Sequence, residues 1–389
     1  MKYLKFFILS CFLFSCSSQD VQSELKIQSI KADVDNAETL FFSNYFEEVS
    51  YVPLETSDTF LLGLVTRMII NDNDIYLQSG KSIFKFSLET GKGILNLSKL
   101  GNGPKEYKSL FDFSIDKKND HIEILDNNGR KIFTYSAEGD FLTSKEIPFM
   151  PFSFMKLNDN TYLFYNSNLG SDFSSSKIVT YNPVSQIKGD EYFTIDKNMA
   201  NYFFLGDEKV FNTTSNNVYC HISPLDTVYV YKEKKGFVPT YFLDFINHAA
   251  PTTFYDRKYR DIMEFSEAAQ KNQYIYSLSN YSVNDQEDVL FSYRLGKIFY
   301  WTFKLGVGTV ITINSFKDDF NSSPSIPLTY HNSSYYLSND FLYFLISAEQ
   351  FLEICNVDST SNEIKELIKS QNISEQSNPI IVKCKIKKK

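Results

Sequence analysis

The stretches GKSIFKFS at residues 80–87 and GRKIFTYS at residues 129–136 decide the fold, because the second repeats the first. In both, apolar and polar residues alternate, and a turn containing glycine follows a few residues later. Such alternation is typical of a half-buried β-strand. Equivalent positions follow one another at steps of 49, 46 and 50 residues: Ile83, Ile132, Ile178 and Val228.

A period of 46 to 50 residues is the size of one blade of a β-propeller, which contains about four short strands. A further strand is predicted behind an Asn/Asp turn in each of the first three units, at residues 73–77, 120–124 and 160–164. One four-stranded sheet cannot bury both faces alone, whereas blades stacked around an axis bury them in turn. Counting strand groups gives six blades with room for a seventh. We therefore expect an all-β, six-bladed β-propeller.

The composition agrees with a folded β-protein and excludes one class of partner. The chain has 389 residues, of which 43% are hydrophobic and 16% aromatic, with 36 Phe and 26 Tyr against one Trp. Phe and Tyr are strand-forming residues. The net charge of −8 argues against nucleic-acid binding, which needs a concentrated basic surface. The lysines of the C-terminal tail alternate with Val382, Cys384 and Ile386, which predicts an edge strand with its charges outward.

The period breaks in the second half of the chain. Residues 245–273 carry apolar residues at helical spacing, so we expect a short helical insertion there, and residues 364–368 predict another short helix. Strands resume at residue 274, and the closing strand is expected at residues 380–386. Residues 48–54 are expected to share its sheet, so that one blade draws on both ends of the chain.

The first residues are a targeting segment and not part of the fold. A short basic start is followed by an apolar run at residues 6–14, which is too short to span a bilayer permanently. The run Leu13-Phe14-Ser15-Cys16 resembles a bacterial lipoprotein signal, in which Cys16 is acylated. The alternative is an ordinary signal peptide with a chance cysteine. We expect a signal peptide at 1–16, a polar linker at 17–40 and the propeller domain at 41–389.

A tight turn separates the first two units, with the sequence GNGPKEY at residues 101–107. Gly101 and Gly103 predict backbone with positive φ, and Pro104 presets the next turn. Glu106 and Tyr107 would then begin the inner strand of the second blade. The turn is not a phosphate-binding loop, because it lacks the Gly-Lys-Ser/Thr ending.

With this turn, the chain resembles the six-bladed β-propeller lipoproteins of the Bacteroidetes type, which are related in form to NHL-repeat propellers. Three further motifs support the resemblance: VPLET at residues 52–56, DTVY at 226–229 and NPIIV at 378–382. Together the motifs cover residues 41–386. The resemblance implies a propeller fold and a location in the cell envelope, and it implies no reaction.

The candidate binding residues are two arginines and the turn pair. Arg67 and Arg294 interrupt apolar strands, and an arginine on an inner strand would bind a carboxylate or sulfate in the channel. The alternative for each is a strand-edge role, with its stem covering apolar surface. Glu106 and Tyr107 would line the same mouth or serve only the turn.

We expect no metal and no cofactor. The four histidines and the scattered Cys220, Cys355 and Cys384 show no metal-ligand spacing. The cysteines are better explained as small buried residues, with one disulfide as the alternative. Aromatic clusters such as residues 299–301 predict core packing rather than a platform for sugars.

Three functions follow from these features. The first is a non-catalytic envelope lipoprotein, anchored in the outer membrane by its lipid, that binds a ligand or an envelope protein at the channel mouth or rim. The alternative is a glycan-active or hydrolytic propeller enzyme with residues gathered across blades. The third is a structural subunit of an outer-membrane assembly. No catalytic residues are predicted, and whether the protein faces the cell surface is left open.

Overall fold

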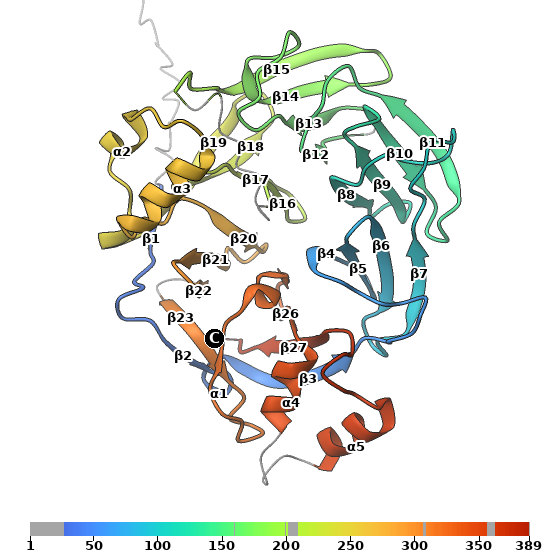
Figure 1. Ribbon diagram of the computed structural model, residues 1–389, viewed down its shortest axis with the longest axis vertical. Helices are drawn as coiled ribbons and strands as arrows, with labels where there is room; N and C mark the ends of the chain where they lie inside the picture. The colour runs from blue at the N-terminus through green and yellow to red at the C-terminus, as the bar shows by residue number, and fades with distance from the viewer. Residues whose placement is uncertain are drawn as a thin grey trace, which may run out of the picture.

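Six β-sheets surround a central axis like the blades of a fan (Figure 1). The computed structural model describes residues 27–388, except 159, 199, 201–208, 306–308 and 356–361. The predicted all-β, six-bladed propeller is confirmed. The expected signal peptide with Cys16, and residues 17–26 of the expected linker, lie outside the described residues.

The first three blades each consist of four consecutive antiparallel strands. The repeated segments that predicted the fold form the third strand of blades 1 to 4. In blades 1 to 3 the strands are β4 (Val65–Asn71), β5 (Asp74–Ser79), β6 (Ser82–Ser87) and β7 (Gly93–Leu97); β8 (Asp112–Asp116), β9 (His121–Asp126), β10 (Lys131–Tyr135) and β11 (Phe141–Glu146); β12 (Ser153–Lys156), β13 (Tyr162–Tyr165), β14 (Ser176–Asn182) and β15 (Ile187–Thr194).

The last three blades use strands from distant parts of the chain. Their own strands are β16 (Phe211–Thr213), β17 (Val218–His221), β18 (Thr227–Lys232) and β19 (Gly236–Asp244); β20 (Leu278–Val283), β21 (Val289–Leu295), β22 (Ile298–Leu305) and β23 (Thr309–Lys317), which also pairs with β24 (Ile326–Pro327); β25 (Tyr335–Leu337), β26 (Phe341–Ile346), β27 (Ile380–Ile386) and β3 (Phe46–Pro53).

Two strands lie within the expected linker at residues 17–40, which corrects the expectation from sequence: residues 28–31 and 38–41 each pair with a blade. β1 (Gln28–Lys31) adds to blade 4 in parallel with β19, and β2 (Glu38–Phe41) adds to blade 5 in parallel with β23. Ile30 and Leu40 are buried against these blades. Each short strand buries only one apolar residue, which does not produce a detectable alternation, so the sequence carries no strand signal here.

Blade 6 joins the two ends of the chain. β27 pairs antiparallel with β3, with Val52 opposite Ile381 and Val49 opposite Cys384. This confirms the predicted shared sheet, in which the early strand lies beside the last one (Figure 1). β27 lies between β26 and β3 and is not an edge strand as expected. Its lysines reach outward: Lys385 pairs with Glu47 at 2.8 Å, and Lys383 lies 4.6 Å from the centre of the Phe341 ring.

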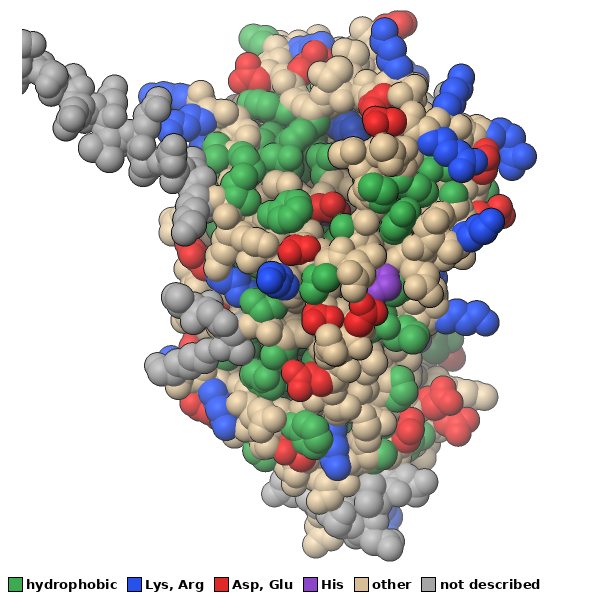
Figure 2. Space-filling view, turned by 90° about the vertical axis from the view of Figure 1, so that its left-hand side faces the viewer, with side chains coloured by type: hydrophobic (Ala, Val, Ile, Leu, Met, Phe, Trp, Pro, Cys, Tyr) green, Lys and Arg blue, Asp and Glu red, His purple; other side chains and the backbone are tan. Residues whose placement is uncertain are grey.

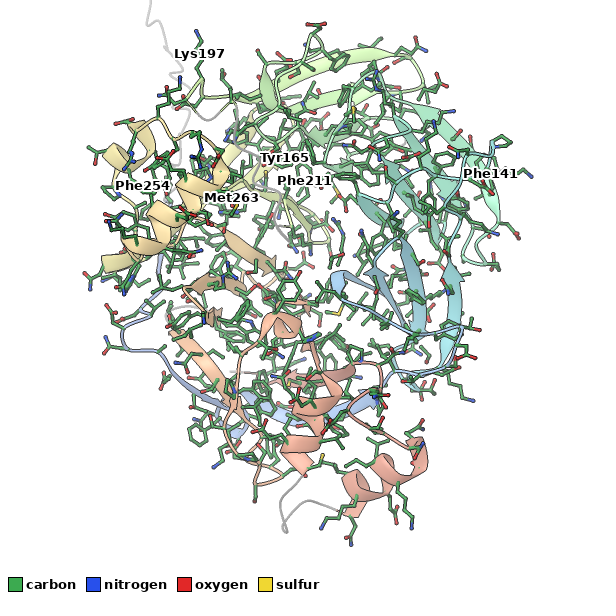
Figure 3. All side chains as sticks on the ribbon, viewed as in Figure 1. Phe141, Tyr165, Lys197, Phe211, Phe254 and Met263 are labelled. Carbon is green, nitrogen blue, oxygen red and sulfur yellow. The ribbon has the colours of Figure 1, made fainter. Side chains whose placement is uncertain are left out.

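The helical insertion lies between blades 4 and 5, as predicted. It contains the 3₁₀ helix η1 (Ile246–His248), α2 (Thr252–Asp256) and α3 (Ile262–Lys271). Asp261 caps α3 by accepting a hydrogen bond from the Glu264 N–H at 2.9 Å. Phe254 and Met263 mark the insertion on the outside of the ring in Figure 3.

Four further helical segments lie outside this insertion in the described part of the chain. The expected helix at residues 364–368 is part of α5 (Asn362–Gln371). The sequence did not predict α4 (Ala348–Cys355), which follows an apolar strand without a clear break. The remaining two are α1 (Phe42–Tyr45), which precedes β3, and the 3₁₀ helix η2 (Tyr330–Ser333), which precedes β25.

Aromatic side chains fill the spaces between blades. Trp301 of blade 5 packs edge-on against Tyr335 and Phe344 of blade 6, at 5.5 and 5.2 Å between ring centres. Tyr165 and Phe211 lie close together on the inner side of blades 3 and 4, whereas Phe141 lies at the outer rim (Figure 3). The predicted core role of the aromatic clusters is therefore confirmed for Trp301. Cys220, Cys355 and Cys384 are all buried.

The pairing of β3 with β27 is tested by a crosslink. Cys384 lies directly opposite Val49. The Cα atoms of directly opposed residues in an antiparallel pair are separated by a distance that a disulfide can bridge. We expect Val49→Cys to form a disulfide with Cys384 under mild oxidation and to stabilise the fold by roughly 2–4 kcal/mol. The measurement is thermal unfolding of the oxidised and reduced variant, with Val49→Ser as the control that has no partner thiol. Failure of the two thiols to crosslink in the folded protein would contradict this register.

Candidate functional site

The first strands of the six blades enclose a central channel. Each of them contacts the first strand of the next blade, and the last, β25, contacts β4, so the ring is closed. All six begin at the same end of the channel, because every blade starts from its innermost strand. Side chains at the beginnings of these strands therefore meet at one mouth, and those at their ends meet at the other.

The cavity at the first mouth, here called the cationic cavity, is lined by residues from blades on opposite sides of the ring. Its space for a solvent-sized group is about 20 Å³. This is enough for a water molecule or one small functional group and too little for a whole organic ligand. The lining residues are Thr66, Arg67, Met68, Lys209, Ser279, Asn280, Tyr330, Ser333 and Ser334.

Arg67 forms an ion pair with Asp112 that links three blades. Its Nη1 donates to Asp112 Oδ1, and the two side chains are only 13% and 3% exposed. Asp112 Oδ2 accepts from Ser153 Oγ at 2.5 Å and from the Phe154 N–H at 3.2 Å. Asp112 Oδ1 also accepts from the Phe113 N–H at 2.8 Å. Both carboxylate oxygens are thus fully used, and one cation of the channel is neutralised.

Lys209, which lies two residues before β16, is the second cation of the cavity. It is half-buried, and the residues that the structure describes provide no carboxylate within ion-pair distance of its Nζ. Desolvation lowers the pKa of Lys209 to about 7. Desolvation makes the largest contribution to this shift; the charges of Arg67 and Lys117 contribute in the same direction, and Asp112 opposes them. When Lys209 is protonated, the cavity carries one positive charge in excess.

Three buried polar atoms around the cationic cavity have no hydrogen-bond partner within the described ranges: Arg67 Nε, Asn280 Oδ1 and Ser333 Oγ. The Asn280 amide is oriented by its Nδ2, which donates to the Ser333 carbonyl oxygen at 2.8 Å. Oδ1 is therefore the free end of this amide. Leaving such atoms unpaired costs about 1–3 kcal/mol each, so a cluster of three needs an explanation.

The cavity at the second mouth is larger, at about 110 Å³, but its polar groups bond to one another. Asp285 accepts from the Ser215 N–H at 2.9 Å and from Ser215 Oγ at 2.7 Å. The hydroxyl of Ser215 lowers the pKa of Asp285. The Asp285 N–H donates to Asn339 Oδ1 at 3.0 Å. These bonds join blades 4, 5 and 6, which indicates that this cavity has a structural role in holding the blades together.

Of the four residues predicted to bind, the structure brings Arg67 to the channel. Arg294 is exposed near the end of β21, the second strand of its blade, and lines neither cavity. Tyr107 is fully buried between blades 1 and 2, where its hydroxyl donates to the Lys81 carbonyl oxygen at 2.8 Å. Glu106 accepts from the Gly103 N–H at 2.8 Å. The turn pair therefore has a structural role.

The turn at residues 101–107 needs glycine for close approach and not for positive φ, which corrects the expectation. Neither Gly101 nor Gly103 has a positive φ. A Cβ on Gly101 would lie 1.9 Å from Glu106 Oε2. The inner strand of blade 2 begins at Asp112 and not at Glu106, because residues 101–107 close on themselves through the Gly101 N–H and the Tyr107 carbonyl oxygen.

Sequence reasoning missed Lys209, Asn280, Ser333 and Asp112. Lys209 follows two acidic residues and resembles an ordinary solvated charge. Asp112 offers the better signal, because it stands between Phe111 and Phe113 at the start of a strand. A carboxylate there is expected to be buried, and a buried carboxylate needs a cation.

The described residues contain no cluster of three or more His, Cys, Asp and Glu side chains that would hold a metal ion. None of the helices in the described part of the chain is long and apolar enough to cross a membrane. On the side of the molecule that Figure 2 shows, acidic and basic side chains are interspersed and form no basic surface.

Comparison with known proteins identifies the family. The model of the family described as domain of unknown function DUF4934 matches residues 25–385. The chain belongs to the DUF4934 family. No curated protein is similar enough in sequence to count as a relative of this DUF4934 protein.

Two solved structures share its fold. A Bacteroides fragilis protein described as exported is 18% identical, with a TM-score of 0.69 over 93% of this chain and 100% of its own. A member of the DUF4221 family from Bacteroides vulgatus is 11% identical, with a TM-score of 0.53 over 88% of this chain and 97% of its own. At these identities, the similarity shows the fold alone.

Removing Asp112 tests the ion pair that shapes the cavity. Asp112→Ala leaves the Arg67 charge buried without compensation and also removes the bonds to blade 3, so we expect a loss of about 3–5 kcal/mol of unfolding free energy. The measurement is denaturant unfolding. As a control, Glu146→Ala breaks the exposed pair between Lys131 and Glu146 and should cost less than about 1 kcal/mol. Equal losses in the two variants would contradict the role given to Asp112.

Proposed function

We propose that this DUF4934 protein is an exported envelope lipoprotein whose propeller binds an anionic group of a ligand or of an envelope protein in the cationic cavity. One observation carries the proposal: among the residues that the structure describes, Lys209 has no counter-charge, and it lines the same cavity as Arg67 and three unpartnered polar atoms. An anion would compensate the excess charge and accept from Arg67 Nε and Lys209 Nζ. Charge-assisted hydrogen bonds of this kind are among the strong ones.

The location is supported by the sequence and by one structural neighbour. The N-terminal run that ends at Cys16 resembles a lipoprotein signal, and acylation of Cys16 would anchor the protein in the outer membrane. The similar Bacteroides fragilis protein is described as exported. The resemblance carried by the turn at residues 101–107 supports an NHL-like type of propeller.

Binding is proposed in preference to catalysis because, among the described residues, Lys209 makes no hydrogen bond to Ser333 Oγ, the contact that would activate this serine as a nucleophile. Acid–base or nucleophilic chemistry uses at least two groups with complementary roles within hydrogen-bond distance. Asp112 accepts on both oxygens and is committed to Arg67 and to blade 3. This arrangement favours holding an anion over transferring a proton.

Acetate is the simplest probe of the cationic cavity. We expect sodium acetate, at constant ionic strength and pH 6, to raise the thermal unfolding temperature of the mature protein in a saturable way, because a ligand of the folded state stabilises it. Lys209→Met should lose this response. Lys235→Met, which removes an exposed lysine outside the channel, should keep it.

The same experiment has a predicted pH dependence. Only protonated Lys209 attracts an anion, and its pKa is about 7, so the apparent affinity should fall up to tenfold per pH unit above pH 7. A response that is identical in Lys209→Met and in the unmodified protein, or no saturable response at pH 6, would refute the proposed site.

A further inference from the structure

We infer that the anionic group is the C-terminal carboxylate of a peptide that ends in an apolar residue. This inference rests on the proposed function, since it names the ligand of the same cavity. It follows from three features of the first mouth. These are the size of the cavity, the presence of both donors and an acceptor among its unpartnered atoms, and the apolar side chains around it.

The size of the cationic cavity limits what enters it. A space of about 20 Å³ takes one small group, so the rest of any ligand has to remain at the mouth. A carboxylate fits this limit and presents two acceptor oxygens. One can accept from Arg67 Nε, which is buried without a partner, and the other from the ammonium group of Lys209. The Ser333 hydroxyl can donate to either oxygen.

Asn280 Oδ1 needs a hydrogen-bond donor in the ligand, in addition to the acceptor that Arg67 Nε needs. Asn280 Oδ1 is buried and unpartnered, while Asn280 Nδ2 is held by the Ser333 carbonyl oxygen. An inorganic anion or a fatty acid has no N–H to offer this oxygen. The C-terminus of a peptide carries an amide N–H one carbon away from its carboxylate. In this arrangement the carboxylate fills the cavity beside Arg67 Nε, and the amide N–H stays at the entrance, where it donates to Asn280 Oδ1.

Exposed apolar residues lie at the same mouth. Leu64 and Phe111 directly precede the inner strands of blades 1 and 2, and Met150 lies just before that of blade 3. Their side chains are 50%, 40% and 42% exposed. Phe111 also packs edge-on against Phe152, at 5.8 Å between ring centres. These residues form an apolar rim beside a site with excess positive charge, which complements a carboxylate attached to an apolar residue.

The test uses peptides labelled with fluorescein at the N-terminus and measured by fluorescence anisotropy. The first peptide has the order glycine, serine, glycine, serine, leucine and a free C-terminal acid. The second has the same order with a C-terminal amide, and the third is an acid that ends in glycine. Acetate and decanoate compete with the first peptide in separate titrations. The protein is the mature chain, alongside Lys235→Met as the variant outside the channel.

We expect the leucine acid to bind at least tenfold more tightly than its amide and several-fold more tightly than the glycine acid. Asn280→Ala should lower the ratio of peptide affinity to acetate affinity, because acetate has no N–H. Circular dichroism confirms that Asn280→Ala is folded, and Asn280→Ser provides a second variant that keeps a polar side chain.

The outcomes separate this inference from the proposed function. If acetate binds but the peptide acid and amide bind equally, the inference is wrong and the anion site stands. Tighter binding of decanoate than of the peptide, with no effect of Asn280→Ala on the peptide-to-acetate ratio, also overturns the inference. If acetate and every peptide fail to bind, the proposed function fails, and the inference fails with it.

Discussion

The structure depends on the pairing of β3 with β27, which closes the ring without a covalent bond. The two outer strands of blade 6 come from opposite ends of the chain: residues 46–53 form β3, and residues 380–386 form β27. Without β3 and β27, blade 6 would have only two of its four strands, and it could not connect blade 5 to blade 1. The cationic cavity combines residues of blades 1, 4, 5 and 6, so its geometry exists only in the closed ring.

Within the closed ring, the two mouths of the channel differ in how their buried polar and charged groups are paired. At the second mouth, Asp285 is satisfied by Ser215 and Asn339, and the polar groups tie blades together. At the first mouth, Asp112 neutralises Arg67 but leaves Lys209 uncompensated and three polar atoms unpaired. Such departures from internal satisfaction are expected where a protein interacts with something else. This contrast is why we propose a binding site at the first mouth of the DUF4934 protein and a structural role for the second.

Much of the fold could be predicted from the sequence, because a blade repeats its core pattern. Ile83, Ile132, Ile178 and Val228 all lie on third strands, and the closing strand has the predicted bounds. β1 and β2 could not be predicted, since each buries a single apolar residue. The site was only partly predictable. Arg67 interrupts an apolar strand and was found, but Lys209 and Asn280 meet it only through the topology. Arg294 gives the same signal as Arg67 in sequence, although its strand is the second of its blade.

Within the described residues, Lys209 has no anionic partner in the channel, and we propose that a ligand anion compensates its charge. The titration of Lys209 tests this proposal most directly. The ε-methylene resonances of Lys209, assigned by comparison with Lys209→Met, report its protonation in an NMR titration. The account predicts a midpoint near pH 7 that moves upward when acetate is added, because a bound anion favours the charged form. A midpoint near that of an exposed lysine, unchanged by acetate, would contradict the account.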